Sequence, residues 1–214
     1  MVRVGSLFSG IGGFDLATEA LGWETAWFSE VNPYCGQVLA KRWPGVPNHG
    51  DITAIDFTTV EPVDVLTGGF PCQDISVAGK GAGIAEGTRS GLWAEYARAI
   101  RHLRPRLVVV ENVRALLVRG ISRVLGDLAD LGYDAEWQVL SAAAVGAPHR
   151  RERVWIVAHA NGVLPPEPRR ARNRGTKPNY RGDSPARWHD THDRQTQPRL
   201  GGMFDELPHR VDGH

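Results

Sequence analysis

The sequence has only two cysteines among its 214 residues, Cys35 and Cys72, which is too few for a disulfide framework and fits a reduced compartment. It also lacks any apolar run near the roughly 20 residues that span a bilayer, and its amino terminus lacks a signal-peptide pattern. A large excess of one charge is missing too, since the formal net charge is +1. These absences argue against a disulfide scaffold and a membrane protein, so we expect a soluble, cytoplasmic protein with no membrane partner.

Apolar segments alternate with helical patterns along residues 1–160, and a hydrophobic content of 42% is enough for a core. Strands are predicted at 2–8, 25–29, 63–66, 107–110, 135–140 and 154–158, with a short candidate at 46–49, and helices at 14–21, 34–43, 92–103 and 117–131. Such alternation is typical of βαβ units. The predicted fold is therefore α/β, with a doubly wound, mostly parallel sheet.

The pattern changes from about residue 165, where prolines and arginines replace the apolar periodicity. Residues 1–164 carry 15 Lys and Arg against 17 Asp and Glu, whereas residues 165–214 carry 10 against 7. We therefore predict one domain at 1–160 and a short, irregular, basic region at 161–214.

A glycine loop lies between the first predicted strand and helix, at Ser9-Gly10-Ile11-Gly12-Gly13. Glu30 ends the next strand, where an acidic side chain can accept hydrogen bonds from the two ribose hydroxyls of a nucleoside-containing cofactor. The spacing of these glycines differs from the dinucleotide-binding fingerprint. This difference favours an adenosine-containing cofactor over a phosphate-bearing one. A tight structural turn is the alternative interpretation.

A second loop contains Cys72 and follows a buried strand. Gly68 and Gly69 end that strand with a turn that brings the backbone close to another group. Pro71 stiffens the loop, so the Cys72 thiol is predicted to project from the carboxyl edge of the sheet as a candidate nucleophile. The alternative is a small, buried, unreactive cysteine.

Charged residues lie next to two further predicted core strands, after one and before the other. Glu111 follows one strand and is expected at the same edge as Cys72, where a thiol beside a carboxyl group suits attack on an electron-poor ring whose nitrogen is protonated. Arg151 and Arg153 alternate at the start of another strand and are expected to point together towards a phosphate, a carbonyl or the thiolate. A solvated glutamate and a basic surface strand are the alternatives.

Together these residues resemble the cytosine-5 DNA methyltransferase family. Residues 6–14 resemble its cofactor-binding motif, residues 69–73 its Pro-Cys motif, and residues 111–113 its Glu-Asn-Val motif. Residues 149–153 resemble its Gln-x-Arg-x-Arg motif, with His149 where Gln is usual. The four motifs occur in the order of the family.

The resemblance implies a DNA (cytosine-5)-methyltransferase that uses S-adenosyl-L-methionine and has a Rossmann-like methyltransferase fold. Cys72 would add to carbon 6 of a cytosine flipped out of double-stranded DNA, while Glu111 protonates ring nitrogen 3 and carbon 5 takes the methyl group. The glycine-rich segment 77–91 would close over the base. A prokaryotic or phage-encoded enzyme of restriction-modification type is the expectation.

The resemblance also implies a role for individual positions. The catalytic positions are Cys72, Glu111, Arg151 and Arg153, and no metal site is implied. The cofactor-binding positions are Phe8, Gly10, Gly12, Gly13, Glu30, Val31, Asp51, Ile52, Pro71 and Leu92. The DNA-binding positions are Gln73, Ser76 and Arg89.

One expected motif is missing. Members of the family usually continue into a target-recognition region and a final Gly-Asn-x-Val motif, which this sequence does not contain. Residues 161–214 would then be a truncated or minimal recognition region, whose positive charge suits phosphate contact better than base reading. Two alternatives stay open: an incomplete subunit or relic that binds cofactor or DNA and needs a second polypeptide, and a tRNA cytosine-5 methyltransferase.

Overall fold

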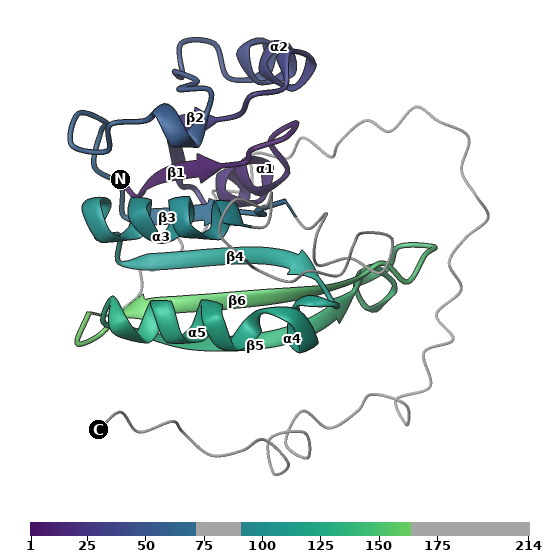
Figure 1. Cartoon of the computed structure of the whole chain (residues 1–214). Helices are drawn as coiled ribbons and strands as arrows, with labels where there is room; N and C mark the ends of the chain where they lie inside the picture. The colour runs from purple at the N-terminus through teal and green to yellow at the C-terminus, as the bar shows by residue number, and fades with distance from the viewer. Residues whose placement is uncertain (72–90, 164–214) are drawn as a thin grey trace. The chain divides into compact units, whose positions relative to one another are not determined.

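The computed structural model describes residues 1–71 and 91–163, which build a six-stranded sheet flanked by helices (Figure 1). The strands are β1 (Arg3–Leu7), β2 (Glu24–Ser29), β3 (Val65–Gly68), β4 (Leu107–Val113), β5 (Tyr133–Ser141) and β6 (Glu152–Ala160). Their order is β2-β1-β3-β4-β6-β5. β1 to β4 are parallel, and β6 is antiparallel to both β4 and β5. The predicted α/β fold with a mostly parallel sheet is confirmed.

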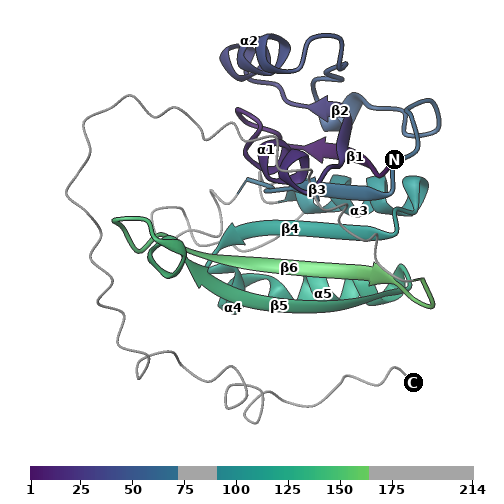
Figure 2. The same ribbon diagram turned by 180° about the vertical axis from the view of Figure 1, so that it is seen from behind.

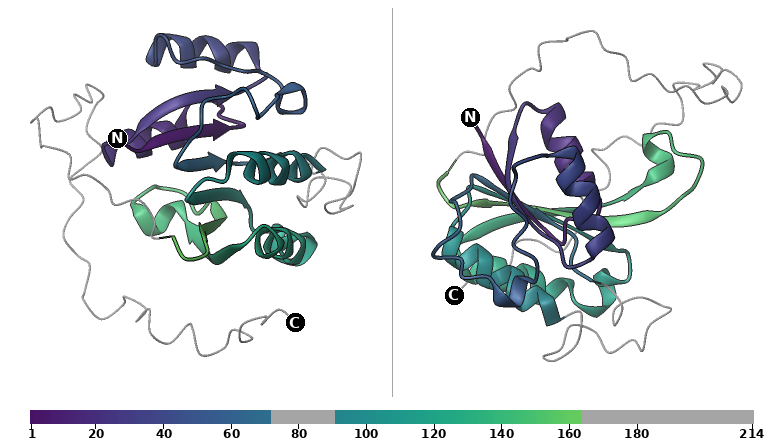
Figure 3. Two further views of the ribbon diagram at one scale, coloured as in Figure 1. Left: turned by 90° about the vertical axis from the view of Figure 1, so that its left-hand side faces the viewer. Right: turned by 90° about the horizontal axis from the view of Figure 1, so that it is seen from above.

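The helices lie on both faces of this sheet. They are α1 (Gly13–Ala20), α2 (Pro33–Arg42), α3 (Leu92–Leu103), α4 (Leu116–Arg119) and α5 (Ile121–Asp130), with 3-10 turns η1 (Ile52–Ala54) and η3 (Ala142–Val145). α3 and α5 lie on one face, α1 lies on the other, and α2 lies beyond the β2 edge (Figure 3). None of the helices within the described segments is long and apolar enough to cross a bilayer.

The main core lies between the sheet and α3. One face of α3 buries Trp93, Tyr96 and Ile100, which fits its helical spacing of apolar residues. The Tyr96 hydroxyl donates to the carbonyls of Leu66 at 3.4 Å and Val109 at 3.1 Å, and burial raises its pKa. Burial of a large apolar side chain such as that of Trp93 or Ile100 contributes roughly 1.5–3 kcal/mol to the free energy of unfolding. α3 is therefore fixed to β3 and β4, the two strands that end at the candidate site.

The helix predicted at 117–131 is not continuous. Gly120 has a non-helical backbone, with φ 176° and ψ −5°, and separates α4 from α5. Its N–H donates to the Leu116 carbonyl at 3.0 Å and its carbonyl accepts from the Val124 N–H at 3.2 Å, so it caps the end of α4 and the start of α5. The break lets α4 bury Leu116 and α5 bury Val124 and Leu128 separately.

The strand candidate at 46–49 is also wrong. The structure has only an isolated parallel bridge there, between Phe28 and Asn48. The Phe28 N–H donates to the Pro47 carbonyl at 2.9 Å and the Phe28 carbonyl accepts from the His49 N–H at 2.8 Å, but Pro47 has no N–H with which to extend the pairing. The contact therefore stays too short to form a strand.

Part of the sheet is open on one side in the described residues. Seen from behind, β4, β6 and β5 lie in front and α5 lies behind them (Figure 2). Trp155 and Val157 of β6 are only half-buried on this open face. The predicted domain boundary at 160/161 and the irregular basic region are not tested, because residues 164–214 lie outside the described part of the chain.

Candidate active site

The glycine loop leaves β1 in a left-handed conformation. Phe8 has φ 51°, Gly10 has φ 55° and Gly12 has φ 86°, and the Gly12 N–H donates to the Ser9 carbonyl at 2.9 Å. A Cβ atom on Gly12 would overlap the indole ring of Trp43, whereas one on Gly10 or Gly13 would meet nothing within 4 Å. The loop is therefore closed at Gly12 and open at Gly10 and Gly13, which leaves room for a ligand beside it.

Glu30 connects this loop to the end of β2. The backbone N–H of Gly10 donates to Glu30 Oε2 at 2.7 Å, and the N–H of Asn32 donates to Oε1 at 2.7 Å. Each carboxylate oxygen can accept a second hydrogen bond. Glu30 is thus placed as the sequence predicts, and its proposed bonds to ribose hydroxyls remain a prediction.

The other cofactor positions of the first half differ in exposure. Asp51 is exposed and caps η1 by accepting from the N–H and the hydroxyl of Thr53, both at 2.9 Å. Ile52 is buried in the main core, while Val31 is 66% exposed next to Glu30. Leu92 is half-buried at the start of α3. Of these four, Asp51 and Val31 therefore offer the most accessible surface to a ligand.

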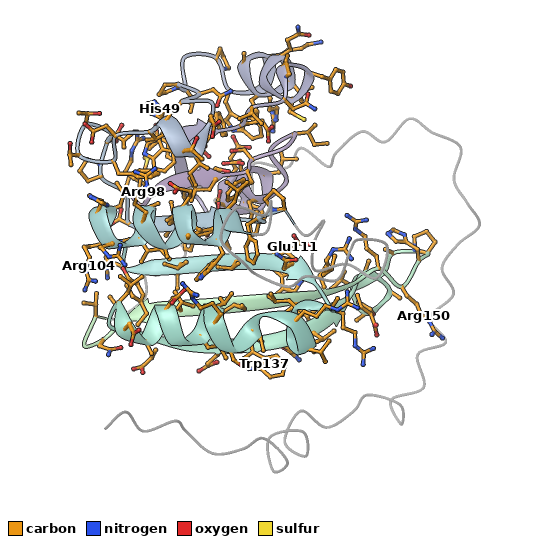
Figure 4. All side chains as sticks on the ribbon, viewed as in Figure 1. His49, Arg98, Arg104, Glu111, Trp137 and Arg150 are labelled. Carbon is orange, nitrogen blue, oxygen red and sulfur yellow. The ribbon has the colours of Figure 1, made fainter. Side chains whose placement is uncertain are left out.

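Glu111 lies within β4, one residue beyond the point where the pairing with β3 ends at Gly68 and Val110 (Figure 4). The expectation that Glu111 follows its strand is wrong, because β4 continues to Val113 through its pairing with β6. Its Oε1 forms an ion pair with Arg153 Nε at 2.7 Å, and both side chains are about three-quarters buried. Its Oε2 lies over Gly69, where a Cβ atom would come within 2.7 Å of that oxygen. The predicted close approach of this backbone to another group is confirmed at Gly69, where the group is the Glu111 carboxylate, although Gly68 is the last residue of β3 and no turn follows it at residue 69.

Asn112 fixes the chain that leads to Cys72. Its Nδ2 donates to the Phe70 carbonyl at 3.1 Å in a buried position, and its Oδ1 accepts from the Val113 N–H at 2.8 Å. The Phe70 ring is buried and packs against Trp93, with ring centroids 5.5 Å apart. Pro71 then ends the first described segment. Glu111 and the entry to the Cys72 loop therefore share one edge of the sheet.

Four predicted positions lie outside the described residues. They are Cys72 and the DNA-binding positions Gln73, Ser76 and Arg89. Nearly all of the predicted closing segment 77–91 also lies outside the described residues. Their roles stay predictions.

Arg151 departs from the predicted alternation. β6 begins at Glu152, and Arg151 precedes it in a left-handed conformation with φ 36°. Alternation along a strand therefore does not apply to Arg151, and the prediction that it shares a face with Arg153 for this reason is wrong. Arg151 is exposed, whereas Arg153 reaches Glu111.

Comparison with known proteins identifies the family. A family model described as C-5 cytosine-specific DNA methylase matches residues 2–203. The chain belongs to this family. Cytosine-specific methylases are thus the group whose motifs the sequence resembles, and the match covers far more than half of the chain.

Curated relatives support the same assignment. The chain is 37% identical over 167 residues to type II methyltransferase M.NgoBI of Neisseria gonorrhoeae, which covers 76% of this chain and 52% of that protein. It is 40% identical over 166 residues to type II methyltransferase M.Eco47II of Escherichia coli, which covers 73% of this chain and 39% of that protein. The chain therefore spans about half the length, or less, of the curated relatives it matches.

A solved structure has a similar fold. The crystal structure of S. pombe Dnmt2 methyltransferase matches with a TM-score of 0.62 at 20% identity, covering 75% of this chain and 50% of that one. At this identity the likeness supports the fold and nothing finer.

Within this methylase fold, the structure also shows a buried carboxylate that the sequence reasoning missed. Asp15 in the first turn of α1 is fully buried and accepts hydrogen bonds from the hydroxyls of Ser6 and Thr25, each at 3.0 Å. Burial raises the pKa of Asp15. The sequence did contain a signal for this residue, because Asp15 falls on the side of the predicted amphipathic helix that faces the sheet. Asp15 ties α1 to β1 and β2 beneath the glycine loop.

Trp43 is a second residue that sequence reasoning did not place at the site. Its indole N–H donates to Glu19 at 2.6 Å and its ring packs against Phe28, with centroids 5.5 Å apart. The same ring fills the space in front of Gly12. Trp43 therefore links the end of α2 to α1 and to the glycine loop, and a tryptophan just before Pro44 carried no sequence signal for this contact.

Proposed function

We propose that the chain is a DNA (cytosine-5)-methyltransferase that transfers a methyl group from S-adenosyl-L-methionine to carbon 5 of a flipped cytosine. The observation that carries this proposal is the position of Glu111. Its carboxylate lies between Gly69 and Arg153, at the edge where Phe70 and Pro71 lead into Cys72. A carboxyl group next to the start of a thiol-bearing loop is what this chemistry needs.

The residues around the glycine loop fit the proposed cofactor. Gly10 and Gly13 leave open space beside the loop, and both oxygens of Glu30 keep one acceptor position each. We propose Phe8, Gly10, Gly12, Gly13, Glu30, Val31, Asp51, Ile52, Pro71 and Leu92 as its binding positions. When bound, S-adenosyl-L-methionine supplies an electrophilic methyl group.

The chain's own residues would carry the remaining steps. The Cys72 sulfur forms a bond to carbon 6 of the cytosine, and Glu111 gives a proton to ring nitrogen 3 as electrons move into the ring. Carbon 5 then takes the methyl group, which releases S-adenosyl-L-homocysteine, and the proton on nitrogen 3 returns to Glu111. Loss of the carbon 5 proton to a base then forms the double bond between carbons 5 and 6 as the bond from carbon 6 to sulfur breaks and frees the Cys72 thiolate. Arg153 pairs with Oε1 of Glu111 while Oε2 lies against Gly69, so Oε2 is the oxygen that would give the proton.

Access to the base requires double-stranded DNA to be opened at one nucleotide. We propose that segment 77–91 closes over the flipped cytosine and that Gln73, Ser76 and Arg89 contact the DNA. Arg151 would orient the base or the Cys72 loop. The relatives named as type II methyltransferases support a restriction-modification role in the cytoplasm of a prokaryote or a phage-infected cell.

The test is the intact mass of the protein after incubation with S-adenosyl-L-methionine and duplex DNA containing 5-fluorocytosine, whose fluorine blocks the final elimination. A covalent adduct is expected for the wild type and for Cys35→Ala, which changes the other cysteine. Cys72→Ala should form none. An adduct that survives Cys72→Ala would overturn the assignment of the nucleophile, and an adduct with tRNA instead of DNA would favour the tRNA alternative.

The open sheet face favours one second candidate, a subunit that needs another polypeptide. On this face, within the described residues, Trp155 and Val157 of β6 are only half-buried. Apolar side chains that remain partly uncovered on one face can mark an interaction surface. Ile11 and Leu16 near the glycine loop are exposed as well. If the chain alone forms no adduct but does so with the product of a neighbouring gene, this candidate replaces the self-sufficient enzyme.

A further inference from the structure

Asn48 makes a pair of hydrogen bonds with the backbone of Glu30. The Glu30 N–H donates to Asn48 Oδ1 at 3.0 Å, and Asn48 Nδ2 donates to the Glu30 carbonyl at 3.0 Å. Oδ1 also accepts from the Gly50 N–H at 3.1 Å. The side-chain amide thus replaces a peptide group of a neighbouring strand, because it offers the same donor and acceptor.

This pair continues a short ladder between the end of β2 and the segment that leads to Asp51. The His49 N–H donates to the Phe28 carbonyl at 2.8 Å, and the Ser29 hydroxyl donates to the Gly50 carbonyl at 2.9 Å. Asn48 supplies the next rung, at Glu30. The end of β2 at Glu30 and the segment that leads to Asp51 are therefore held together by these bonds, and the exposed Asn48 side chain supplies those at Glu30 itself.

The Glu30 carboxylate depends on this backbone. Its two oxygens accept from Gly10 and Asn32, which leaves one acceptor position on each oxygen, and the carboxylate is held between these two N–H groups and its own backbone. A shift of the Glu30 backbone would turn these free positions away from a ligand held at the glycine loop. Hydrogen bonds to a charged group are strongly directional and are weakened by such a shift.

We propose that Asn48 is a positioning residue of the cofactor site, which holds the Glu30 backbone so that the Glu30 carboxylate meets the ribose hydroxyls. This inference rests on the proposed function, because it requires an adenosine-containing cofactor at Glu30. Asn48 thereby determines how strongly the site prefers ribose to deoxyribose, although Asn48 itself does not contact the ligand.

The experiment is calorimetric titration of the whole chain with S-adenosylhomocysteine and with its 2′-deoxyribose analogue. Asn48→Asp keeps Oδ1 and removes the Nδ2 donor. The matched control is Asn161→Asp, the same change at an exposed turn after β6. Asn48→Asp should bind S-adenosylhomocysteine about tenfold more weakly than the wild type, since one charge-assisted hydrogen bond is worth about that much. Its affinity for the 2′-deoxy analogue, which keeps only one of the two ribose hydroxyls, should fall by a clearly smaller factor, and Asn161→Asp should match the wild type for both ligands.

The ratio of the two affinities separates the outcomes. If Asn48 only supports the local fold, both affinities fall together and the ratio stays at its wild-type value, which overturns the inference alone. If the wild type binds neither ligand, the proposed function fails and the inference fails with it. Asn48→Gln keeps the amide on a longer side chain and replaces Asn48→Asp if the latter lowers the melting temperature. A double-mutant cycle with Glu30→Gln should be non-additive, because Asn48 acts through Glu30.

Discussion

The Glu111 carboxylate covers Gly69 so closely that residue 69 has no room for a side chain. A Cβ atom there would lie 2.7 Å from Oε2, a distance that real Cβ atoms essentially never reach. β3 and β4 are parallel neighbours with Gly68 opposite Val110, so the residues after them meet at one edge. Arg153 holds the other carboxylate oxygen at 2.7 Å. A glycine and a guanidinium together set the position of Glu111.

Gly69→Ala should therefore displace Glu111 without breaking the fold. Methyl transfer is expected to fall on the order of 100-fold, because a small misplacement of a reacting group has this effect. Cofactor affinity should stay near that of the wild type, since the glycine loop is untouched. Methylation rates and calorimetry measure the two quantities.

The matched control is Gly126→Ala in α5, where a Cβ atom meets nothing within 4 Å. That change should leave the methylation rate unaltered and raise the free energy of unfolding by roughly 0.5–1 kcal/mol, because alanine is the better helix former. Full activity in Gly69→Ala would show that the position of Glu111 is not set by Gly69.

Asn112→Ala should destabilise the protein. Asn112 is almost fully buried, and its loss leaves the buried Phe70 carbonyl without this donor at a cost of about 1–3 kcal/mol. Chemical denaturation at neutral pH measures the change. Asn112→Asp, which keeps the Oδ1 acceptor for Val113 and loses the donor, should show most of the same effect. A variant as stable as the wild type would mean that the bond to Phe70 contributes nothing net.

The parts of this site that follow from short-range pattern were predictable from sequence, and the parts that depend on packing were not. Glycines between a strand and a helix, and Glu111 after an apolar run, already indicate one edge of a parallel sheet. The ion pair of Glu111 with Arg153 depends on β6 lying antiparallel to β4. The antiparallel direction of β6 cannot be predicted from the local sequence.

The errors have a common physical origin. The helix predicted at 117–131 follows apolar spacing that continues through Gly120, and spacing alone cannot show that this glycine has a non-helical backbone. Arg151 fails in the same way, because alternation assumes a strand that in fact begins one residue later. Trp43 and Asn48 act across loops, through contacts that periodicity does not describe.

Asp15 should make the stability depend on pH. Burial raises its folded-state pKa above the unfolded value, so its contribution is fully present below the ordinary carboxyl pKa of 3.8 and is lost as the pH rises through the folded pKa. Within that window the folded state binds more protons than the unfolded state, and the free energy of unfolding falls with rising pH.

Asp15→Asn removes this titration while keeping a side chain of the same shape beside Ser6 and Thr25. The difference in the free energy of unfolding, variant minus wild type, should become more positive from about pH 4 upward, a window that follows from the carboxyl reference value. Denaturation of both proteins at a series of pH values measures it. Parallel curves for the two proteins would contradict a raised pKa.

Gly12 and Gly13 are adjacent but should respond differently to alanine, because they face different surroundings. Gly12 has φ 86° and its missing Cβ points at Trp43, so Gly12→Ala combines backbone strain with a clash and should cost about 1–3 kcal/mol of stability. At Gly13, the first residue of α1, a Cβ atom meets nothing within 4 Å. Gly13→Ala should therefore leave the melting temperature unchanged or raise it slightly.

If the open side of the loop receives the cofactor, the same Gly13→Ala variant should still lose affinity for S-adenosylhomocysteine, by about tenfold or more, since a methyl group would occupy ligand space. A stable Gly13→Ala protein with wild-type affinity would show that the ligand does not contact the loop at this residue, and the binding surface would then have to be sought nearer Glu30 and Asp51.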